Sequence, residues 1–304
     1  MSHKATLSVV VLIGDPARDA LSIRMALERQ VRIPDEVIVV DSSADGSVSD
    51  WLGNGYRVHS IAKADFHHGR TRNLGASLAQ GEILVFMTQD ALLADEYSLE
   101  NLVFPIESDV VEATYARQVP KEDAGLLERF ARGFNYPARP RTKSLADVEK
   151  LGFRAFFFSD VCSAVRANVF WEVGGFPENT IMMEDALLCA KLLRAGYKVK
   201  YEAEAQVFHS HNWGMLQQFK RNFDVGVSIS QAGSLLKGAR VTGEGFRFVT
   251  GQAWYVYKAG DYIGVLRVFA ESAARYLGFS LGKRERYIPR AIKRHLSLYS
   301  FFWS

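Results

Sequence analysis

Residues 61–91 read IAKADFHHGRTRNLGASLAQGEILVFMTQDA and join three patterns in a fixed order. A polar loop rich in His and Arg occupies 67–73. A helix is expected over 74–80, and Gly81 would end it with a positive φ. The run ILVFM at 83–87 is continuously apolar, which is typical of a strand buried on both faces of a parallel sheet.

The apolar run ends in Thr88-Gln89-Asp90. Ligands of open α/β sheets bind outside the carboxyl ends of the strands, and arginine binds phosphates bidentately. Taken singly, an Asp after a strand is more often a turn residue and an Arg is more often solvated. In this order, however, the arginine-rich loop and the carboxylate indicate a metal–diphosphate site.

Similar patterns extend on both sides of this stretch. A helix with apolar spacing is expected over 17–30, after the first strand. Strands alternating with helices at this spacing predict βαβ units and a parallel sheet. The first strand is not followed by G-x-G-x-x-G, and G-x-x-x-x-G-K-[ST] is absent, which argues against a dinucleotide dehydrogenase and a P-loop NTPase. The expected strands are Leu7–Ile13, Glu36–Val40, Tyr56–Ile61, Asp109–Ala116, Asp160–Val165, Lys198–Tyr201 and Ala205–Phe208.

The bulk properties are those of an ordinary globular protein of 304 residues, 48% hydrophobic and 23% charged. A net charge of +3 is too small to indicate a nucleic-acid partner. Cys162 and Cys189 form neither a metal motif nor a disulfide framework, which favours a reducing compartment. The N-terminus lacks a signal-peptide layout, and no apolar run reaches the roughly 18 residues of a membrane span. A cytoplasmic protein is expected.

The second half contains a mixed segment, 121–154, which we expect to be a partly helical insertion over the site. Glu184-Asp185 opens a helix expected to end at Ala195, and acidic residues there also favour the helix dipole, so a capping role is the alternative. Beyond Trp213 the chain becomes helical, basic and aromatic. This composition predicts a surface that lies on an anionic membrane, with a packing or oligomer face as an equal alternative.

Taken together, these pieces resemble the family-2 glycosyltransferases of GT-A fold. The resemblance covers about Leu7 to Trp213 and rests on VVVLI, VIVVDSSADGS, RTRNLGASLAQGEILVFMTQDA, VGGFPE, EDALLCAKLLRAGY and a late HSH. Within this family the chain looks most like bacterial rhamnosyltransferases that build cell-surface polysaccharide. The segments that carry this closer resemblance are FHHGRTRNLGA, TQDA, ARQVP, FNYP and HSHNW. The fold implied is α/β, with a GT-A type, mostly parallel nucleotide-binding sheet flanked by helices. Residues 1–213 would form the catalytic domain and 214–304 a helical extension.

The resemblance also implies roles for individual residues. Asp185 would be the general base, with Glu184 beside it orienting the acceptor. Thr88-Gln89-Asp90 falls at the family's D-x-D motif, but Thr88 replaces the first Asp, so a weak or substrate-assembled site for Mg²⁺ or Mn²⁺ is expected. The implied metal ligands are Asp90 and His209, with His211 in reserve. The residues expected to contact the nucleotide sugar are Asp41, Arg70, Arg72, Asn73, Gln89 and Lys191.

The activity implied is an inverting transfer of L-rhamnose from dTDP-L-rhamnose to a lipid-linked or growing polysaccharide acceptor, at the inner face of the cell membrane. A UDP-hexose donor is the alternative within this class. A nucleotidylyltransferase and a non-catalytic nucleotide-sugar-binding assembly protein are the alternatives outside it. The catalytic interpretation requires that the carboxylates of Asp90 and Asp185 converge on one cleft.

Overall fold

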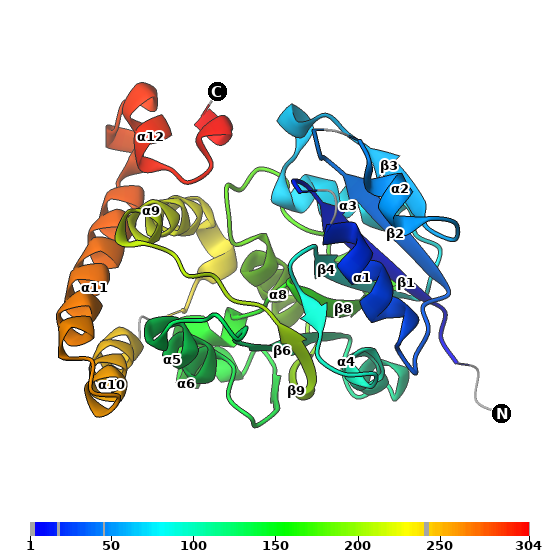
Figure 1. Ribbon diagram of the computed structural model, residues 1–304, viewed down its shortest axis with the longest axis horizontal. Coiled ribbons are helices and arrows are strands. Elements are labelled where there is room, and N and C mark those ends of the chain that lie inside the picture. Colours follow the sequence, from blue (N-terminus) through cyan, green and yellow to red (C-terminus); the bar gives the residue numbers. More distant parts are fainter. Residues whose placement is uncertain (1–3, 17–18, 45, 240–242, 304) are drawn as a thin grey trace.

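The computed structural model describes residues 4–16, 19–44, 46–239 and 243–303. Its centre is one curled sheet in the order β3-β2-β1-β4-β8-β6-β9-β5, with β7 paired to β9 (Figure 1). Strands β3, β2, β1 and β4 run parallel, and so do β6 and β9, whereas β8 is antiparallel to both β4 and β6. The described strands are β1 (Leu7–Ile13), β2 (Glu36–Asp41), β3 (Arg57–Ser60), β4 (Ile83–Thr88), β5 (Leu92–Leu93), β6 (Ala113–Val119), β7 (Arg141–Lys143), β8 (Cys162–Arg166) and β9 (Val199–Phe208).

The continuous apolar strands are buried on both faces, as their composition predicts. In β1, Val9 and Val11 belong to the core on one face, and Val10 belongs to the core on the other. The first face is covered by α1 (Asp19–Glu28), α2 (Val48–Leu52) and α4 (Ser98–Glu107). The second is covered by α3 (His68–Leu78), α7 (Ala167–Glu172) and α8 (Glu184–Arg194). The GT-A fold class is confirmed, with a mixed sheet whose N-terminal half is parallel.

The helix expected over 74–80 is longer at its N-terminus, because α3 already begins at His68. The backbone N–H of His67 donates to the Thr71 hydroxyl at 3.0 Å, and the Thr71 N–H donates to the His67 carbonyl at 2.8 Å, which closes the first turn. The polar loop prediction was therefore wrong. The helix ends at Leu78, and Gly81 does not have the positive φ expected of it. A Cβ at Gly81 would lie 2.5 Å from the Ser8 hydroxyl oxygen, so close packing explains this glycine.

Other predicted boundaries also differ. The strand expected from Asp109 begins at Ala113, because Asp109 has φ 54° and belongs to a turn. The two strands expected near the end of the catalytic domain are one, β9, with a register shift opposite Ala116/Arg117. The expected helix start at Ala17 lies outside the described residues, and the described helix begins at Asp19.

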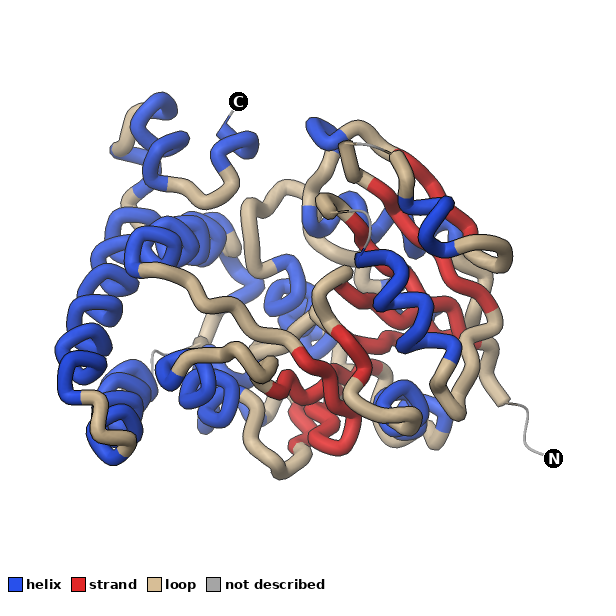
Figure 2. Tube along the Cα trace, in the orientation of Figure 1, coloured by secondary structure: helices blue, strands red, loops and turns tan. Residues whose placement is uncertain are grey.

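The C-terminal region is helical and stands beside the sheet (Figures 1 and 2). Its long helices α9 and α11 pack closely, since a Cβ at Gly282 would lie 2.0 Å from the Phe223 carbonyl oxygen. Helix α5, from the 121–154 segment, contacts α10 through Phe130 and Phe248. None of the described helices is long and apolar enough to cross a membrane. The remaining helices are α5 (Leu126–Asn135), α6 (Asp147–Leu151), α9 (Met215–Gln231), α10 (Glu244–Lys258), α11 (Tyr262–Gly282) and α12 (Arg290–Leu296).

The end of the chain packs inside the protein. Trp303 is buried in a cluster with Phe223 and Val227 of α9, and Tyr299 and Phe302 lie against this cluster. Part of the aromatic tail that favoured a membrane surface is thus used for packing, which was the alternative. Other aromatic and apolar residues of this region remain exposed, on α10, α11 and α12 and at Tyr287 and Phe301.

Candidate active site

A cavity of about 560 Å³ lies between the end of the sheet and the C-terminal helices. It is lined by residues that are far apart in the sequence, including Asp90 after β4, Asp185 at the start of α8 and Tyr299 near the C-terminus. Asp90 and Asp185 therefore converge on one cleft, as the catalytic interpretation requires. Two groups of ionisable side chains face this cavity.

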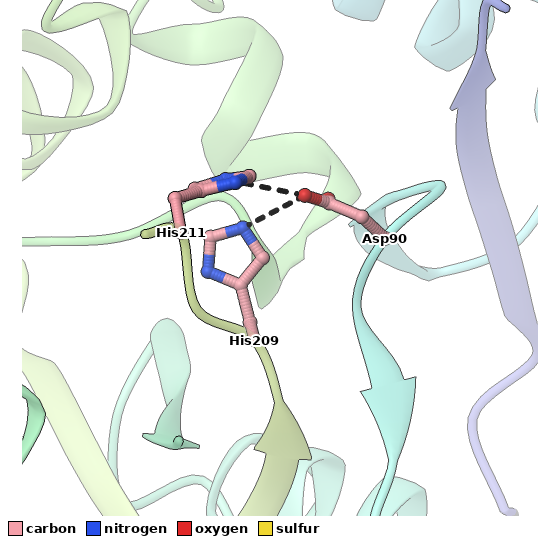
Figure 3. A group of neighbouring side chains, drawn as sticks. All are labelled: Asp90, His209 and His211. Carbon is pink, nitrogen blue, oxygen red and sulfur yellow. Dashed lines mark ion pairs between the residues drawn. The ribbon is translucent and has the colours of Figure 1, made fainter. Parts of the chain in front are cut away.

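The first group, called here the histidine cluster, consists of Asp90, His209 and His211 (Figure 3). Strand β5 follows Asp90 and pairs with the end of β9, with Leu92 opposite Phe208, so the two histidines after β9 are brought beside the carboxylate. The Nε2 atoms of His209 and His211 each lie 3.2 Å from the same oxygen, Oδ2 of Asp90.

The electrostatics of the histidine cluster favour an ionised carboxylate beside a neutral imidazole. Burial raises the pKa of Asp90, but the close contact with His209 and the positive charge that both histidines carry when protonated outweigh burial and hold that pKa below its usual range. Burial and, to a smaller extent, the charge of the nearby His209 lower the pKa of His211 to about 4. A carboxylate and unprotonated imidazoles are the forms that bind metal ions.

The donor set fits a divalent cation. The three ligand atoms lie within 4.8 Å of one another, and Thr88 lines the same cavity without supplying the second carboxylate of a D-x-D motif. Imidazole nitrogens suit transition metals, whereas Mg²⁺ prefers oxygen ligands. Two nitrogens and one carboxylate therefore fit Mn²⁺ better than Mg²⁺.

The second group, called here the carboxylate cluster, consists of Arg72, Asp160, Glu184 and Asp185. Nε of Arg72 lies 3.0 Å from Oδ2 of Asp160, and Nη1 of Arg72 lies 3.2 Å from Oε1 of Glu184. Arg72, Asp160 and Glu184 are all buried. One guanidinium thus stands among three carboxyl groups, and it compensates only part of their charge.

This shortage of positive charge is consistent with raised pKa values for Asp160 and Asp185. Burial raises the pKa of Asp160 to about 7; Arg72 opposes the rise and Glu184 adds to it. Burial also raises the pKa of Asp185 well above its usual value, and the charges of Asp160 and Glu184 act in the same direction. A carboxylate with a raised pKa is a stronger base, which suits it to accept a proton from a hydroxyl group.

Five of the six residues predicted to contact the nucleotide sugar lie outside the histidine cluster and the carboxylate cluster. The amide of Asn73 exchanges two hydrogen bonds of 2.9 Å with the backbone of Phe176, and Lys191 Nζ donates to the Gly174 and Gly175 carbonyls at 3.0 and 2.8 Å. These contacts hold the Gly-Gly turn between α7 and α8. The roles of Asn73 and Lys191 in nucleotide binding stay predictions.

The other three lie near the carboxyl edge of the parallel strands or at the start of α3. The Gln89 side chain accepts from the Gly14 N–H at 2.5 Å and so holds the loop after β1. Asp41 is buried at the end of β2 and accepts from the Ser43 N–H at 2.8 Å. Arg70 is exposed on α3 and donates to the Asp65 carbonyl at 3.1 Å. Asp41 and Gln89 lie at the carboxyl ends of β2 and β4, but neither lines the cavity, so their roles in nucleotide binding stay predictions.

Several cavity residues escaped the sequence analysis, among them Asp160, Gln118 and Tyr299. Asp160 was placed at the start of a predicted strand, and its ion pair with Arg72 joins positions 88 residues apart. Gln118 lies in the ARQVP segment, which contributed to the family resemblance but suggested no role. Tyr299 was counted among tail aromatics because no periodic pattern connects the tail to the site.

Comparison with known proteins settles the family. Residues 21–174 match the family described as "Glycosyl transferase family 2". The chain is 40% identical over 285 residues to the O-antigen chain rhamnosyltransferase RfbN of Salmonella typhimurium (strain LT2), covering 92% of this chain and 90% of that one. The chain belongs to glycosyltransferase family 2. It is 35% identical to the O-antigen chain rhamnosyltransferase WbaN of Salmonella anatum, covering 92% of this chain and 89% of that one.

This family-2 enzyme is therefore a nucleotide-sugar glycosyltransferase, and its similarity to bacterial rhamnosyltransferases is confirmed. Family membership decides against the nucleotidylyltransferase and the non-catalytic alternatives. Solved structures support the fold. A mannosyltransferase from Pyrobaculum calidifontis, PcManGT, in complex with GDP-Man and Mn²⁺, aligns with TM-score 0.57 and 14% identity, covering 99% of this chain and 86% of that one. TarS 1-349 of S. aureus with UDP-GlcNAc aligns with TM-score 0.51 and 15% identity, covering 93% and 91%.

Proposed function

We propose that this family-2 enzyme transfers L-rhamnose from dTDP-L-rhamnose to a growing polysaccharide acceptor, with inversion at the anomeric carbon. The donor assignment is supported by the two O-antigen rhamnosyltransferases that share 40% and 35% identity with the chain over most of its length. The observation that carries the mechanism is that the histidine cluster and the carboxylate cluster line the same cavity.

In this proposal Asp185 is the general base. An acceptor hydroxyl is a poor nucleophile, so a carboxylate within hydrogen-bond reach must take its proton as the oxygen attacks the anomeric carbon. Asp185 begins α8 and lines the cavity, and its raised pKa makes it a better proton acceptor than an ordinary aspartate. Glu184 is engaged by Arg72 at 3.2 Å, which leaves Asp185 as the carboxylate available to the acceptor.

A single displacement accounts for inversion, because the chain then needs one base and no protein nucleophile. The two cysteines are buried, and burial raises their pKa values to about 12 for Cys162 and about 11 for Cys189, so neither is a thiolate at neutral pH.

Asp90, His209 and His211 would hold Mn²⁺. When bound, such an ion stabilises the negative charge that develops on the departing nucleoside diphosphate. Asp41 and Gln89 are the candidates for the nucleoside side of the donor, because they lie at the carboxyl ends of β2 and β4. Arg70 is the candidate for the diphosphate, since its exposed guanidinium has capacity beyond its one backbone bond.

The acceptor would be lipid-linked and reached at the inner face of the cell membrane, with the C-terminal helices against an anionic lipid surface. Helix α11 supports this: Ile263 and Leu266 are 81% and 71% exposed, and Tyr262 beside them is also exposed. Sedimentation with anionic vesicles should carry down the full chain, and Ile263→Asp combined with Leu266→Asp should leave it in solution. Equal binding by both proteins would favour the alternative, an oligomer face.

Hydrolysis of a panel of nucleotide sugars, with and without Mn²⁺, tests the proposed function. We expect dTDP-L-rhamnose to be cleaved fastest, Mn²⁺ to be required, and the first sugar released to have the opposite anomeric configuration by NMR. Preference for a UDP-hexose would overturn the donor assignment. Retention of configuration would overturn the single displacement.

A further inference from the structure

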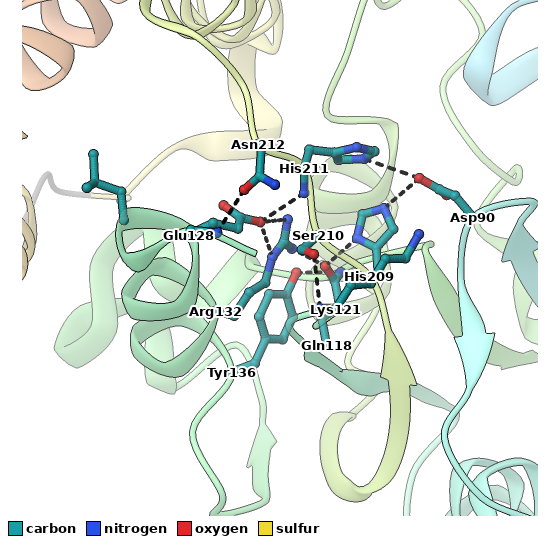
Figure 4. Close-up of polar contacts among 12 residues, drawn as sticks. Asp90, Gln118, Lys121, Glu128, Arg132, Tyr136, His209, Ser210, His211 and Asn212 are labelled. Atoms are coloured by element: carbon teal, nitrogen blue, oxygen red, sulfur yellow. Dashed lines mark hydrogen bonds and ion pairs between the residues drawn. The ribbon is translucent and has the colours of Figure 1, made fainter. Parts of the chain in front are cut away.

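Gln118, near the end of β6, is 3% exposed and is surrounded by polar groups (Figure 4). Its Oε1 lies 2.9 Å from Nδ1 of His209 and also accepts a hydrogen bond from Nη1 of Arg132. Its Nε2 donates to the Tyr136 and Ser159 hydroxyl oxygens, each at 2.7 Å. The glutamine therefore connects a histidine of the proposed metal site to α5.

The chemistry of these neighbours fixes the orientation of the amide. A guanidinium has donors only, so the amide atom that faces Arg132 must be the carbonyl oxygen. The hydroxyls at the other end can accept from the amide nitrogen. Nδ1 of His209 faces the same carbonyl oxygen, and it must carry a proton in order to bond with it.

A neutral imidazole protonated on Nδ1 has its lone pair on Nε2. Nε2 of His209 points at Oδ2 of Asp90, and Nε2 of His211 lies 3.2 Å from that oxygen as well (Figure 3). A lone pair facing a carboxylate is unfavourable unless a cation or a proton lies between them. The glutamine thus presents His209 in the form that a metal ion requires.

We propose that Gln118 is a positioning residue that holds His209 in the tautomer with Nε2 free and so prepares the histidine cluster to bind a divalent cation. This inference rests on the proposed function, which places Mn²⁺ at the same cluster. Hydrogen-bond partners of metal-binding histidines fix the tautomer and ring orientation, and their loss typically weakens metal binding by about 10- to 100-fold.

Helix α5 supports both histidines from behind. Glu128 and Arg132 are four residues apart on α5, which places them on one side of the helix, and Tyr136 directly follows its last residue. Oε1 of Glu128 pairs with Arg132 at 2.6 Å and accepts from the His211 backbone N–H at 3.2 Å. The segment expected to cover the site from above therefore also anchors the metal ligands.

Three variants separate this role from a general structural one. Gln118→Leu removes the acceptor for Nδ1. Gln118→Glu keeps an oxygen toward His209 and Arg132, and the two hydroxyls can rotate to donate to its other oxygen. Ser159→Ala is the matched control, because it removes a bond at the opposite end of the same amide.

The experiment is a titration of each folded, metal-free protein with MnCl₂ alone, followed by calorimetry or by the EPR signal of free Mn²⁺. We expect Gln118→Leu to bind Mn²⁺ about 10- to 100-fold more weakly than the wild type. Gln118→Glu and Ser159→Ala should stay close to the wild type. Unchanged affinity in Gln118→Leu, or equal weakening in all three variants, would overturn the proposal.

A second measurement does not depend on the metal or on the leucine variant folding. Long-range ¹H–¹⁵N correlation spectra of the metal-free wild type at pH 8 report which nitrogen of His209 carries the proton. We expect Nδ1 to carry a proton, and a ring protonated on Nε2 alone would overturn the inference. If the spectra show Nδ1–H but the wild type binds no Mn²⁺, the metal assignment of the proposed function fails while the role of Gln118 in setting the tautomer stands.

Discussion

The two walls of the cavity, the histidine cluster and the carboxylate cluster, differ in how their charges are balanced. In the histidine cluster, one carboxylate lies between two imidazoles, and the pKa of Asp90 falls below its usual range. In the carboxylate cluster, one guanidinium serves three carboxyl groups, and burial and mutual repulsion raise the pKa values of Asp160 and Asp185. One fold thus keeps one aspartate ionised and makes another a stronger base.

This difference suggests that the two clusters have separate chemical roles. Carboxyl groups whose environments push their pKa values apart commonly take different chemical roles. An aspartate that stays ionised over a wide pH range suits metal binding, and an aspartate with a raised pKa suits proton transfer. Substitutions on either side should therefore have separable effects, on catalytic proton transfer for one wall and on metal affinity for the other.

The largest effect is expected from Asp185→Asn. The amide cannot accept the acceptor's proton, so kcat should fall by about 10²- to 10⁴-fold. Affinity for the nucleotide sugar and for Mn²⁺ should change little, because the histidine cluster is untouched. Steady-state kinetics with calorimetry would separate the two, and Asp50→Asn on the exposed face of α2 is the control. Turnover close to that of the control would remove Asp185 from the base role.

Loss of the metal should have the next largest effect on activity. The stabilisation that a metal gives to developing charge is worth several kcal/mol. Chelation with EDTA should therefore reduce transfer by about 100-fold or more, and added Mn²⁺ should restore it. Asp90→Asn should need far more Mn²⁺ for half-maximal activity and should leave the pH dependence of kcat at saturating metal as in the wild type. If Asp90→Asn needs the same Mn²⁺ concentration for half-maximal activity as the wild type, the histidine cluster is not the metal site and the two clusters do not have separate roles.

Much of the fold was predictable because its signals are local. Continuous apolar runs such as Leu7–Ile13 and Ile83–Met87 are typical of strands buried on both faces, and the structure has strands at both places. Asp90 was also found from the sequence, because it follows a buried strand. His209 and His211 were expected beside it because the family resemblance implied them, and the structure brings all three together.

The rest depends on contacts between distant residues. The His/Arg segment looked like a loop because its helix start relies on the backbone and hydroxyl bonds between His67 and Thr71 and on burial of its inner side chains. Arg72 was expected at the diphosphate, yet it is paired with Asp160 and Glu184, which are 88 and 112 positions away. No spacing rule connects such positions, so the carboxylate cluster could not be predicted as a unit.

A smaller effect, on pH dependence, is expected from Asp160→Asn. The charge of Asp160 raises the pKa of Asp185, so removing it should lower that pKa. A base works only when deprotonated, and its activity rises with pH through its pKa. The acidic limb of the kcat profile should therefore move to lower pH, while Mn²⁺ affinity stays the same. A limb that stays in place, or that moves to higher pH, would show that the two carboxyl groups do not interact as inferred.

The smallest effect on catalysis is expected where the chain end supports the carboxylate cluster. Oδ2 of Asp224, buried on α9, accepts from the backbone N–H groups of Leu298 and Tyr299 at 2.8 and 3.3 Å. The Tyr299 ring centroid lies 4.8 Å from that of His68, whose Nδ1 is 3.7 Å from Glu184. The tail is thus packed against the side of the cavity that carries the carboxylate cluster.

Asp224→Ala leaves these N–H groups unpaired and should lower the free energy of unfolding by about 1–3 kcal/mol, with a modest fall in kcat and unchanged Mn²⁺ affinity. Burial raises the pKa of Asp224 from 3.8 to about 6. A raised pKa means that its contribution to stability is fully present below pH 3.8 and is lost as the pH rises through 6. Asp224→Asn keeps an oxygen acceptor and should lack this loss, which denaturant unfolding between pH 4 and 8 can measure. Weaker Mn²⁺ binding in Asp224→Ala would show instead that the tail supports both walls, and the separation of the two clusters would no longer hold.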